Sequence, residues 1–187
     1  MKQKTLQVHT GQEIIKRVNA SGKIKNNLFI AGVGLIGSSL IEMVGNIGSI
    51  NICGLINSKK MIIDSKDIDY KNWETDLDKS LDADLDSFID IASQTPNSIF
   101  VDLTASKKIS MKTSEILARG ISVVTANKIT NSMNQEYYDE IRVSELIGNA
   151  RFKYETNVGA GLPIIETLQT LLSTGDKILK IEGVLSG

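Results

Sequence analysis

Residues 28–37 read Leu-Phe-Ile-Ala-Gly-Val-Gly-Leu-Ile-Gly, an apolar run that leads into three glycines spaced as G-x-G-x-x-G. In a strand–turn–helix unit, the first glycine permits a tight turn and the second lets the backbone approach a pyrophosphate. The third lets the helix pack close to the strand. The free amides at the start of the helix then face the phosphate charge. The stretch therefore predicts a dinucleotide site, formed by Gly32, Gly34, Leu35, Ile36 and Gly37.

Strand and helix signals alternate from Asn27 onward, which is typical of an α/β fold with a doubly wound, mainly parallel Rossmann-type sheet. The predicted strands cover residues 27–31, 50–56, 98–102, 121–124, 151–154 and 178–185. The predicted helices cover residues 36–45, 80–93, 110–119 and 133–148, and a last one begins at Pro163 and ends at Gly175. The predicted inward face of the first helix comprises Leu35, Ile36, Ser39, Leu40, Met43 and Val44.

Composition excludes several classes of function. The chain has 187 residues and a formal net charge of −1, so no strong field attracts nucleic acid or an anionic membrane. The first residues lack a signal peptide's apolar segment, and no apolar run approaches the roughly 20 residues that span a bilayer. The single cysteine, Cys53, excludes an internal disulfide and favours a cytoplasmic location. The single histidine, His9, argues against a histidine-ligated metal or a Ser-His triad.

The end of the second strand decides which nucleotide is favoured. NAD-selective domains usually place an acidic residue there, whereas this chain has Asn57-Ser58-Lys59-Lys60. Asn57 removes repulsion against a 2′-phosphate, Ser58 can donate a hydrogen bond, and Lys59 or Lys60 can supply positive charge. The pattern predicts NADP, with NAD as the alternative, unless the segment is only a solvated polar turn.

Two further strand ends open onto the same predicted crevice. After the strand at 98–102, Thr104, Ala105 and Ser106 can contact the nicotinamide ribose, or Thr104 or Ser106 can simply cap a helix. After the strand at 121–124, Lys128 lies where it can stabilise charge on a carbonyl oxygen or donate a proton. The alternative is an ordinary surface lysine.

An oxygen-rich loop follows the last of these strands. Glu155 precedes Asn157-Val158-Gly159-Ala160-Gly161, and such a loop can hold a hard cation. The alternative is a flexible hinge between two domains.

Six segments together resemble homoserine dehydrogenase, most closely the dehydrogenase part of bifunctional aspartokinase/homoserine dehydrogenases. They are residues 31–38, 54–59, 101–106, 124–128, 156–166 and 182–187. The segment Asn157-Val158-Gly159-Ala160-Gly161-Leu162-Pro163 is far more specific than the glycine fingerprint. The resemblance covers residues 27–187.

The resemblance implies NADP-linked interconversion of L-homoserine and L-aspartate 4-semialdehyde, in the threonine and methionine branch of aspartate metabolism. It implies that Thr104 and Lys128 contact the cofactor, that Lys128 is catalytic, and that the parent enzyme is a homo-oligomer. It also implies a site for a monovalent cation such as Na⁺, formed by Glu155 and the carbonyls of Val158, Ala160 and Leu162. Glu182 and Gly183 would open the substrate domain and bind substrate.

The family's acidic substrate-binding residues and a second catalytic lysine lie beyond the matching segments. We therefore expect a fragment that binds cofactor but lacks a complete active site and is itself monomeric. Its expected parts are a linker or domain remnant (1–26), a dinucleotide-binding domain (27–162) and the start of a substrate domain (163–187). Two other hypotheses remain open: another small-substrate dehydrogenase, and a non-catalytic nucleotide sensor.

Overall fold

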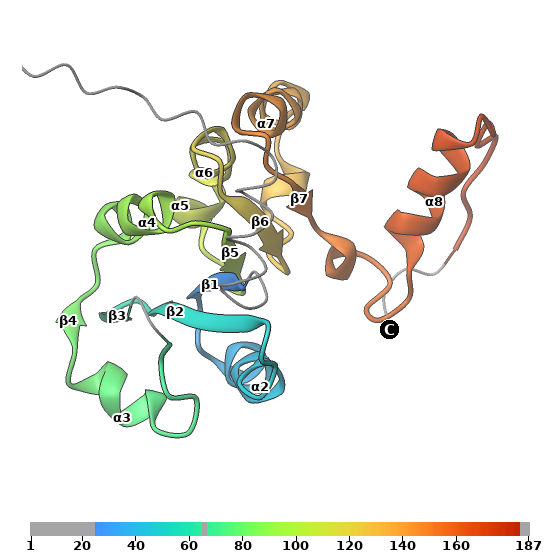
Figure 1. The fold of residues 1–187 in the computed structure, drawn as a ribbon. Helices are drawn as coiled ribbons and strands as arrows, with labels where there is room; N and C mark the ends of the chain where they lie inside the picture. Colours follow the sequence, from blue (N-terminus) through green and yellow to red (C-terminus); the bar gives the residue numbers. More distant parts are fainter. Residues whose placement is uncertain (1–24, 65–66, 184–187) are drawn as a thin grey trace, which may run out of the picture.

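The computed structural model describes residues 25–64 and 67–183 (Figure 1). His9 and nearly all of the segment predicted as a linker lie outside this part. The strands are β1 (Asn26–Ala31), β2 (Ile50–Ile56), β3 (Lys60–Ile63), β4 (Leu81–Asp82), β5 (Ser98–Asp102), β6 (Ser122–Thr125) and β7 (Phe152–Lys153). The α-helices are α2 (Leu35–Val44), α3 (Trp73–Asp78), α4 (Leu85–Gln94), α5 (Lys107–Ser110), α6 (Thr113–Ala118), α7 (Gln135–Gly148) and α8 (Ile164–Ser173). Two short 3₁₀ helices are η1 (Thr130–Ser132) and η2 (Glu155–Asn157).

The strands form one sheet in the order β4-β3-β2-β1-β5-β6-β7. The pairs β1–β2, β1–β5, β5–β6 and β6–β7 are parallel, which confirms the predicted α/β sheet. Strands β3 and β4 pair antiparallel at one edge and were not predicted. The order reverses direction at β1, because the chain runs from β1 to β2 on one side and later to β5 on the other. Ligands of open α/β sheets bind beyond the carboxyl ends of strands at such a point.

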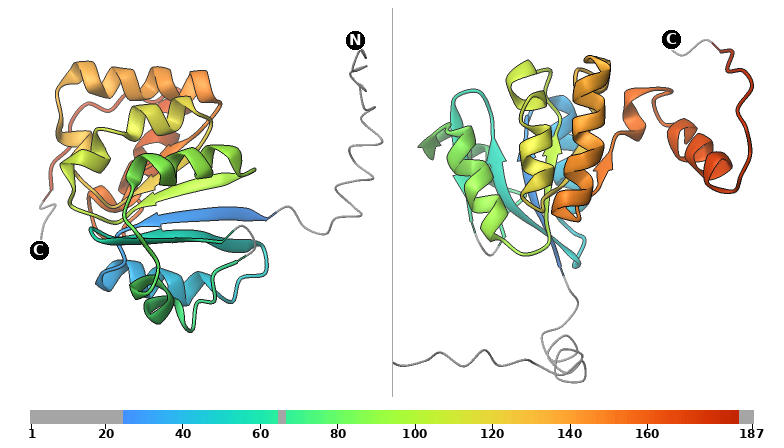
Figure 2. Two further views of the ribbon diagram at one scale, coloured as in Figure 1. Left: turned by 90° about the vertical axis from the view of Figure 1, so that its left-hand side faces the viewer. Right: turned by 90° about the horizontal axis from the view of Figure 1, so that it is seen from above.

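Helices cover both faces of the sheet, with α2 and α3 on one face and α4, α6 and α7 on the other (Figure 2). Because neighbouring side chains of a strand point to opposite faces, β1 contributes to two cores. Leu28 and Ile30 pack with residues of α2 and α3, including the buried Trp73. Phe29 and Ala31 belong to the other core, where Phe29 and Phe88 meet edge to face at 5.5 Å between ring centroids.

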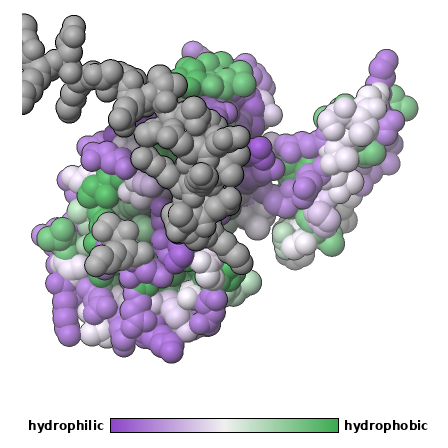
Figure 3. Space-filling model, in the orientation of Figure 1, coloured by the Kyte–Doolittle hydropathy of each residue, from purple (hydrophilic) through white to green (hydrophobic). Residues whose placement is uncertain are grey.

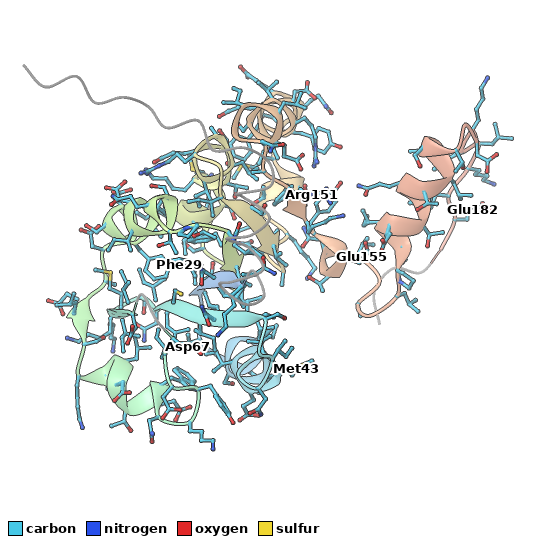
Figure 4. All side chains as sticks on the ribbon, viewed as in Figure 1. Phe29, Met43, Asp67, Arg151, Glu155 and Glu182 are labelled. Carbon is cyan, nitrogen blue, oxygen red and sulfur yellow. The ribbon has the colours of Figure 1, made fainter. Side chains whose placement is uncertain are left out.

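The predicted inward face of the first helix is wrong at four of its six positions; Val44 is buried and Leu40 packs against the core, as predicted. Gly37, Ile41 and Val44 are the buried residues of α2, whereas Leu35 and Met43 are 86% and 73% exposed. Ile36 and Ser39 are also exposed. Figure 4 shows Met43 on the outer side of α2. The spacing 37, 41, 44 follows the helical period, and the glycine selects this face because it alone permits close contact with the turn before it.

Three other boundaries differ from prediction. Helix α4 begins at Leu85 rather than at residue 80, because the Asp84 side chain accepts hydrogen bonds from the amides of Asp86 and Ser87 and so caps it. The helix predicted over 110–119 is instead two short helices, α5 and α6. Residues 178–183, which belong to a predicted strand, form no strand; Leu179 is 93% exposed, with no neighbouring strand beside it in the described residues.

Helix α8 projects away from the sheet and its covering helices (Figures 1 and 2). All its residues are exposed or half-buried. Apolar side chains also lie on the surface of α7, where Leu146 and Ile147 are exposed. Figure 3 shows a hydrophobic patch at the top of the molecule, over this helix. No helix in residues 25–64 and 67–183 has the length and hydrophobicity required to cross a membrane.

Candidate nucleotide-binding site

The three glycines make a tight connection between β1 and α2. Gly32 adopts φ +94°, a conformation that favours glycine, and its amide donates to the Ile56 carbonyl at 2.9 Å. A Cβ on Gly37 would lie 2.1 Å from the Gly32 carbonyl oxygen, so only glycine fits at the helix–turn contact. Around Gly34 no atom lies within 4 Å of where a Cβ would be. The turn is therefore closed at Gly32 and Gly37 and open at Gly34, as a pyrophosphate site requires.

Helix α2 begins without a side-chain cap. Gly34 is its N-cap residue and provides no side-chain acceptor for the first amides. The amides of Leu35 and Ile36 therefore remain available at the positive end of a ten-residue helix. The side chains of these two residues point outward, so they contribute through the backbone alone.

A cleft of about 770 Å³ opens beside this turn, at the carboxyl ends of β1, β2 and β5. Eight residues predicted to bind cofactor line it: Gly32, Gly34, Asn57, Ser58, Lys59, Thr104, Ala105 and Ser106. Gly37 lies buried beneath the turn, and Lys128 is not among the lining residues. Four lining residues that the prediction did not include are Asp78, Ala83, Leu85 and Lys108, and Val33, Ile56 and Ile109 complete the wall.

The turn after β2 is organised by Asn57. Its side-chain oxygen accepts hydrogen bonds from the amides of Lys59 and Lys60 at 2.8 and 2.7 Å. Ser58 and Lys59 are exposed at the cleft. Of the two lysines that could supply charge, Lys59 lines the cleft, whereas the Lys60 ammonium group binds Asp82 at 3.0 Å and the Ser80 carbonyl at 3.2 Å.

A buried carboxylate joins the ends of β5 and β6. Asp102 accepts from the Thr104 amide (2.9 Å) and hydroxyl (2.7 Å), and from the Asn127 side-chain amide (3.0 Å). Burial raises the pKa of the Asp102 carboxyl, against the opposing effect of these donated bonds. The same Asn127 amide also donates to the Ser106 carbonyl at 3.2 Å. Asp102 and Asn127 therefore hold the Thr104–Ser106 wall of the cleft in place.

No role was predicted from the sequence for Asp102 or Asn127. The only signal was a polar residue at the end of each strand. Nothing in the sequence says that residues 25 positions apart hydrogen-bond.

Lys128 follows Asn127 directly and is exposed. The Asn127 carbonyl accepts from the Asn157 side chain at 3.4 Å, and the Thr125 carbonyl accepts from the Thr156 hydroxyl at 3.3 Å. Lys128 thus lies at the junction between the loop after β6 and the loop after β7. The catalytic role assigned to it remains a prediction.

The Glu155 carboxylate caps α8. Its two oxygens accept from the amides of Ile165 (2.9 Å) and Glu166 (3.0 Å), and Figure 4 shows Glu155 between η2 and this helix. The following loop turns sharply, with φ +76° at Gly159 and +51° at Ala160, and the Leu162 carbonyl accepts from Ile164. The described residues hold no group of three His, Cys, Asp or Glu side chains suited to a metal. The cation site at Glu155, Val158, Ala160 and Leu162 depends on backbone carbonyls and remains a prediction.

Glu182 and Gly183 lie beyond α8, far from the cleft. Glu182 is exposed, forms an ion pair with Lys180 at 2.6 Å, and stands on the outer segment in Figure 4. The structure brings neither residue to Lys128 or to the glycine turn, so their role in substrate binding remains a prediction.

The family model for the NAD-binding domain of homoserine dehydrogenase matches residues 32–155. The chain belongs to the homoserine dehydrogenase family. The match contains the glycine turn from Gly32 onward, the turn after β2, the Thr104–Ser106 wall and Lys128.

Relatives of this chain include the bifunctional aspartokinase/homoserine dehydrogenase of Haemophilus influenzae, which is 37% identical over 174 residues. That alignment covers 86% of this chain and 21% of the relative. The homoserine dehydrogenase of Schizosaccharomyces pombe is 32% identical, with 86% of this chain and 46% of that protein covered. A hyperthermophilic archaeal homoserine dehydrogenase in complex with NADPH superimposes with a TM-score of 0.66 at 25% identity, covering 80% of this chain and 50% of that one. The chain therefore spans about a fifth to a half of the length of these proteins.

Proposed function

We propose that this chain is the NADP-binding part of an enzyme that interconverts L-homoserine and L-aspartate 4-semialdehyde. The observation that carries the proposal is the turn at Gly34, which is open where a pyrophosphate needs room and is followed by uncapped amides of α2. The family match and the archaeal relative solved with NADPH support the choice of cofactor class.

The residues of the cleft fit such a nucleotide. The first turn of α2 would hold the pyrophosphate, and Asn57, Ser58 and Lys59 would surround the 2′-position of the adenosine ribose. No acidic side chain follows β2 directly, and the Lys59 ammonium favours a phosphate there. When bound, the nicotinamide supplies or accepts a hydride. Lys128 would hold a proton near the substrate oxygen and stabilise charge that develops on it.

The finer parts of this proposal concern the whole enzyme. We infer that the 187 residues bind cofactor without completing the active site, because relatives extend well beyond the matched region. We also propose that the complete enzyme is a homo-oligomer with a small-molecule substrate and a monovalent-cation site at Glu155. A cytoplasmic location is proposed as well, although relatives from plants are named chloroplastic.

Calorimetric titration with NADPH and NADH tests the proposal. We expect both to bind, NADPH more tightly. A chain that is folded by circular dichroism and binds neither nucleotide would refute it. A second candidate function, a non-catalytic nucleotide sensor, predicts the same binding. Only an assay of dehydrogenase activity in the longer protein distinguishes the two functions.

A further inference from the structure

We propose that Lys108 is a second determinant of NADP selectivity, which faces Lys59 across the adenosine end of the cleft. This inference rests on the proposed nucleotide-binding function. The pattern in the sequence predicts the preference for NADP from the segment after β2 alone. Lys108 lies on the opposite side of the glycine turn from that segment.

The lining residues show which end of the cleft receives adenosine. The cleft spans both sides of the glycine turn: Lys59, Asp78 and Leu85 lie on the β4 side of β1, and the segment that ends with Lys108 and Ile109 follows β5 on the other side. Lys128 follows β6 on the other side of β1 and does not line the cleft. With the pyrophosphate at Gly34, the enclosed part therefore accommodates the adenosine half of the nucleotide, and the reacting ring lies toward β6.

Three charged side chains line this adenosine end. Lys59 follows β2, Lys108 belongs to α5 after β5, and Asp78 ends α3. Strands β2 and β5 flank β1 on opposite sides, so the two lysines approach the cleft from opposite walls. The neighbouring Lys60 is held by Asp82, which leaves Lys59 and Lys108 as the ammonium groups that line the cleft in the described residues.

The backbone that carries Lys108 is fixed in position. The Ser106 hydroxyl caps α5 by accepting from the Ile109 amide, and the Ser106 carbonyl accepts from the buried Asn127. A lysine on an anchored segment loses less freedom when it binds than one on a mobile loop. Its side chain nevertheless remains exposed and lines the cleft.

In the part of the chain that the structure describes, no acidic group forms an ion pair with Lys108. Asp84 lies close enough that Lys108 contributes to its lowered pKa, but the main causes of that shift are the hydroxyl and amide of Ser87, which donate to the carboxylate. Asp84 does not line the cleft, and among the side chains that do, two lysines stand against the single carboxylate of Asp78. This excess of ammonium groups in the lining suits the 2′-phosphate that distinguishes NADPH from NADH.

Charge-neutralising variants test the inference, with the ratio of the NADPH and NADH dissociation constants as the readout. We expect Lys108→Gln to weaken NADPH binding about five- to tenfold and NADH binding less than about twofold, since the lost contact is charged and partly exposed. Lys107→Gln is the matched control, because Lys107 is the exposed neighbour that does not line the cleft. Asp78→Asn should move the ratio in the opposite direction, and higher salt should reduce both effects.

The outcomes separate this inference from the function on which it rests. If the wild-type chain binds neither nucleotide, the proposed function fails and the inference with it. If the wild-type chain binds both, but Lys108→Gln leaves the ratio unchanged or weakens both nucleotides equally, only the inference is overturned. The thermal unfolding midpoint of each variant distinguishes a loss of affinity caused by a changed cleft from one caused by a destabilised fold.

Discussion

At the scale of single residues, the three glycines of the fingerprint have different tasks, and the structure separates them. Gly34→Val should weaken nucleotide binding by at least about tenfold, because the new side chain fills space left open beside the turn. Its φ of −75° suits any residue, so the midpoint of thermal unfolding should stay near that of the wild type.

The control for Gly34→Val is Gly37→Ala, which should cost about 1–3 kcal/mol of unfolding free energy because its Cβ meets a backbone oxygen. Equal nucleotide affinity in Gly34→Val and wild type would place the pyrophosphate elsewhere.

Asn57 offers a way to change cofactor preference without disturbing its turn. Asn57→Asp keeps an oxygen that accepts from the amides of Lys59 and Lys60, while it adds a negative charge where a 2′-phosphate would lie. We expect the NADPH-to-NADH affinity ratio to fall by about tenfold at low salt. Asn57→Ala, which removes the acceptor, should instead lower stability by about 1 kcal/mol. An unchanged NADPH-to-NADH affinity ratio in Asn57→Asp would show that Asn57 does not lie beside the 2′-phosphate.

At the scale of elements, the parallel strands and their helices were predictable because apolar runs of the right length alternate with amphipathic segments. The edge pair β3 and β4 was not, since β3 consists of only four residues directly after the Asn57 turn, and β4 of two. Those strands exist because partners are available, as in the pairing of Met61 with Leu81. The buried face of α2 was also mispredicted. Apolar residues lie on both sides of this helix, and the close contact at Gly37 decides which side is buried.

The reactivity of the single cysteine, Cys53, can show whether β2 stays closed in the folded protein. Burial chiefly raises the pKa of the Cys53 thiol from 9.0 to about 11, with smaller contributions from Asp67 and Asp64. Because the folded pKa lies above the unfolded one, this group's contribution to stability is complete below pH 9 and is lost as the pH rises toward 11. At pH 8 we expect iodoacetamide to modify the native thiol at least about a hundredfold more slowly than the urea-unfolded chain. Comparable rates in both states would show that β2 opens readily.

Helix α8 depends on a carboxylate from outside itself. Glu155→Gln removes one of the two oxygens that accept from Ile165 and Glu166, and it removes the negative charge at the helix N-terminus. We expect about 0.5–2 kcal/mol less protection of the amides of residues 164–173 in hydrogen exchange. Glu166→Gln, within the helix, is the control and should change protection much less. Unchanged exchange in Glu155→Gln would show that the helix does not need this cap.

At the scale of the whole molecule, the hydrogen bonds around Asp102 join the loop proposed to bind cofactor to the loop that carries Lys128. Asp102 and Asn127 connect the Thr104–Ser106 wall to the loop that carries Lys128, and Asn127 is bonded in turn to Asn157. No periodicity in the sequence contains these contacts, because they join three segments distant in the chain. The family resemblance predicted which segments meet, whereas only the structure shows the atoms that join them.

Binding and turnover should separate in this chain. Hydride transfer requires the substrate to be oriented near the nicotinamide while charge on its oxygen is managed. The cleft offers a place for the nucleotide and Lys128 one charged group, but Glu182 and Gly183 do not line the cleft, and Glu182 lies on the segment beyond α8. We therefore expect the 187 residues to bind NADPH and to oxidise homoserine at or near background, measured as NADPH formation at 340 nm.

Joining the chain to the remaining part of a homoserine dehydrogenase relative should restore turnover. In that longer enzyme, Lys128→Ala should lower kcat by about 10²–10⁴-fold while the NADPH dissociation constant changes much less, because a group that moves a proton acts mainly in the transition state. If the Lys128→Ala enzyme kept the wild-type kcat, Lys128 would only pack against the cofactor and would take no part in proton transfer. Rapid turnover by the 187 residues alone would mean that the groups orienting the substrate lie within them, and that the search for those groups should begin at the junction of Lys128 with Asn157.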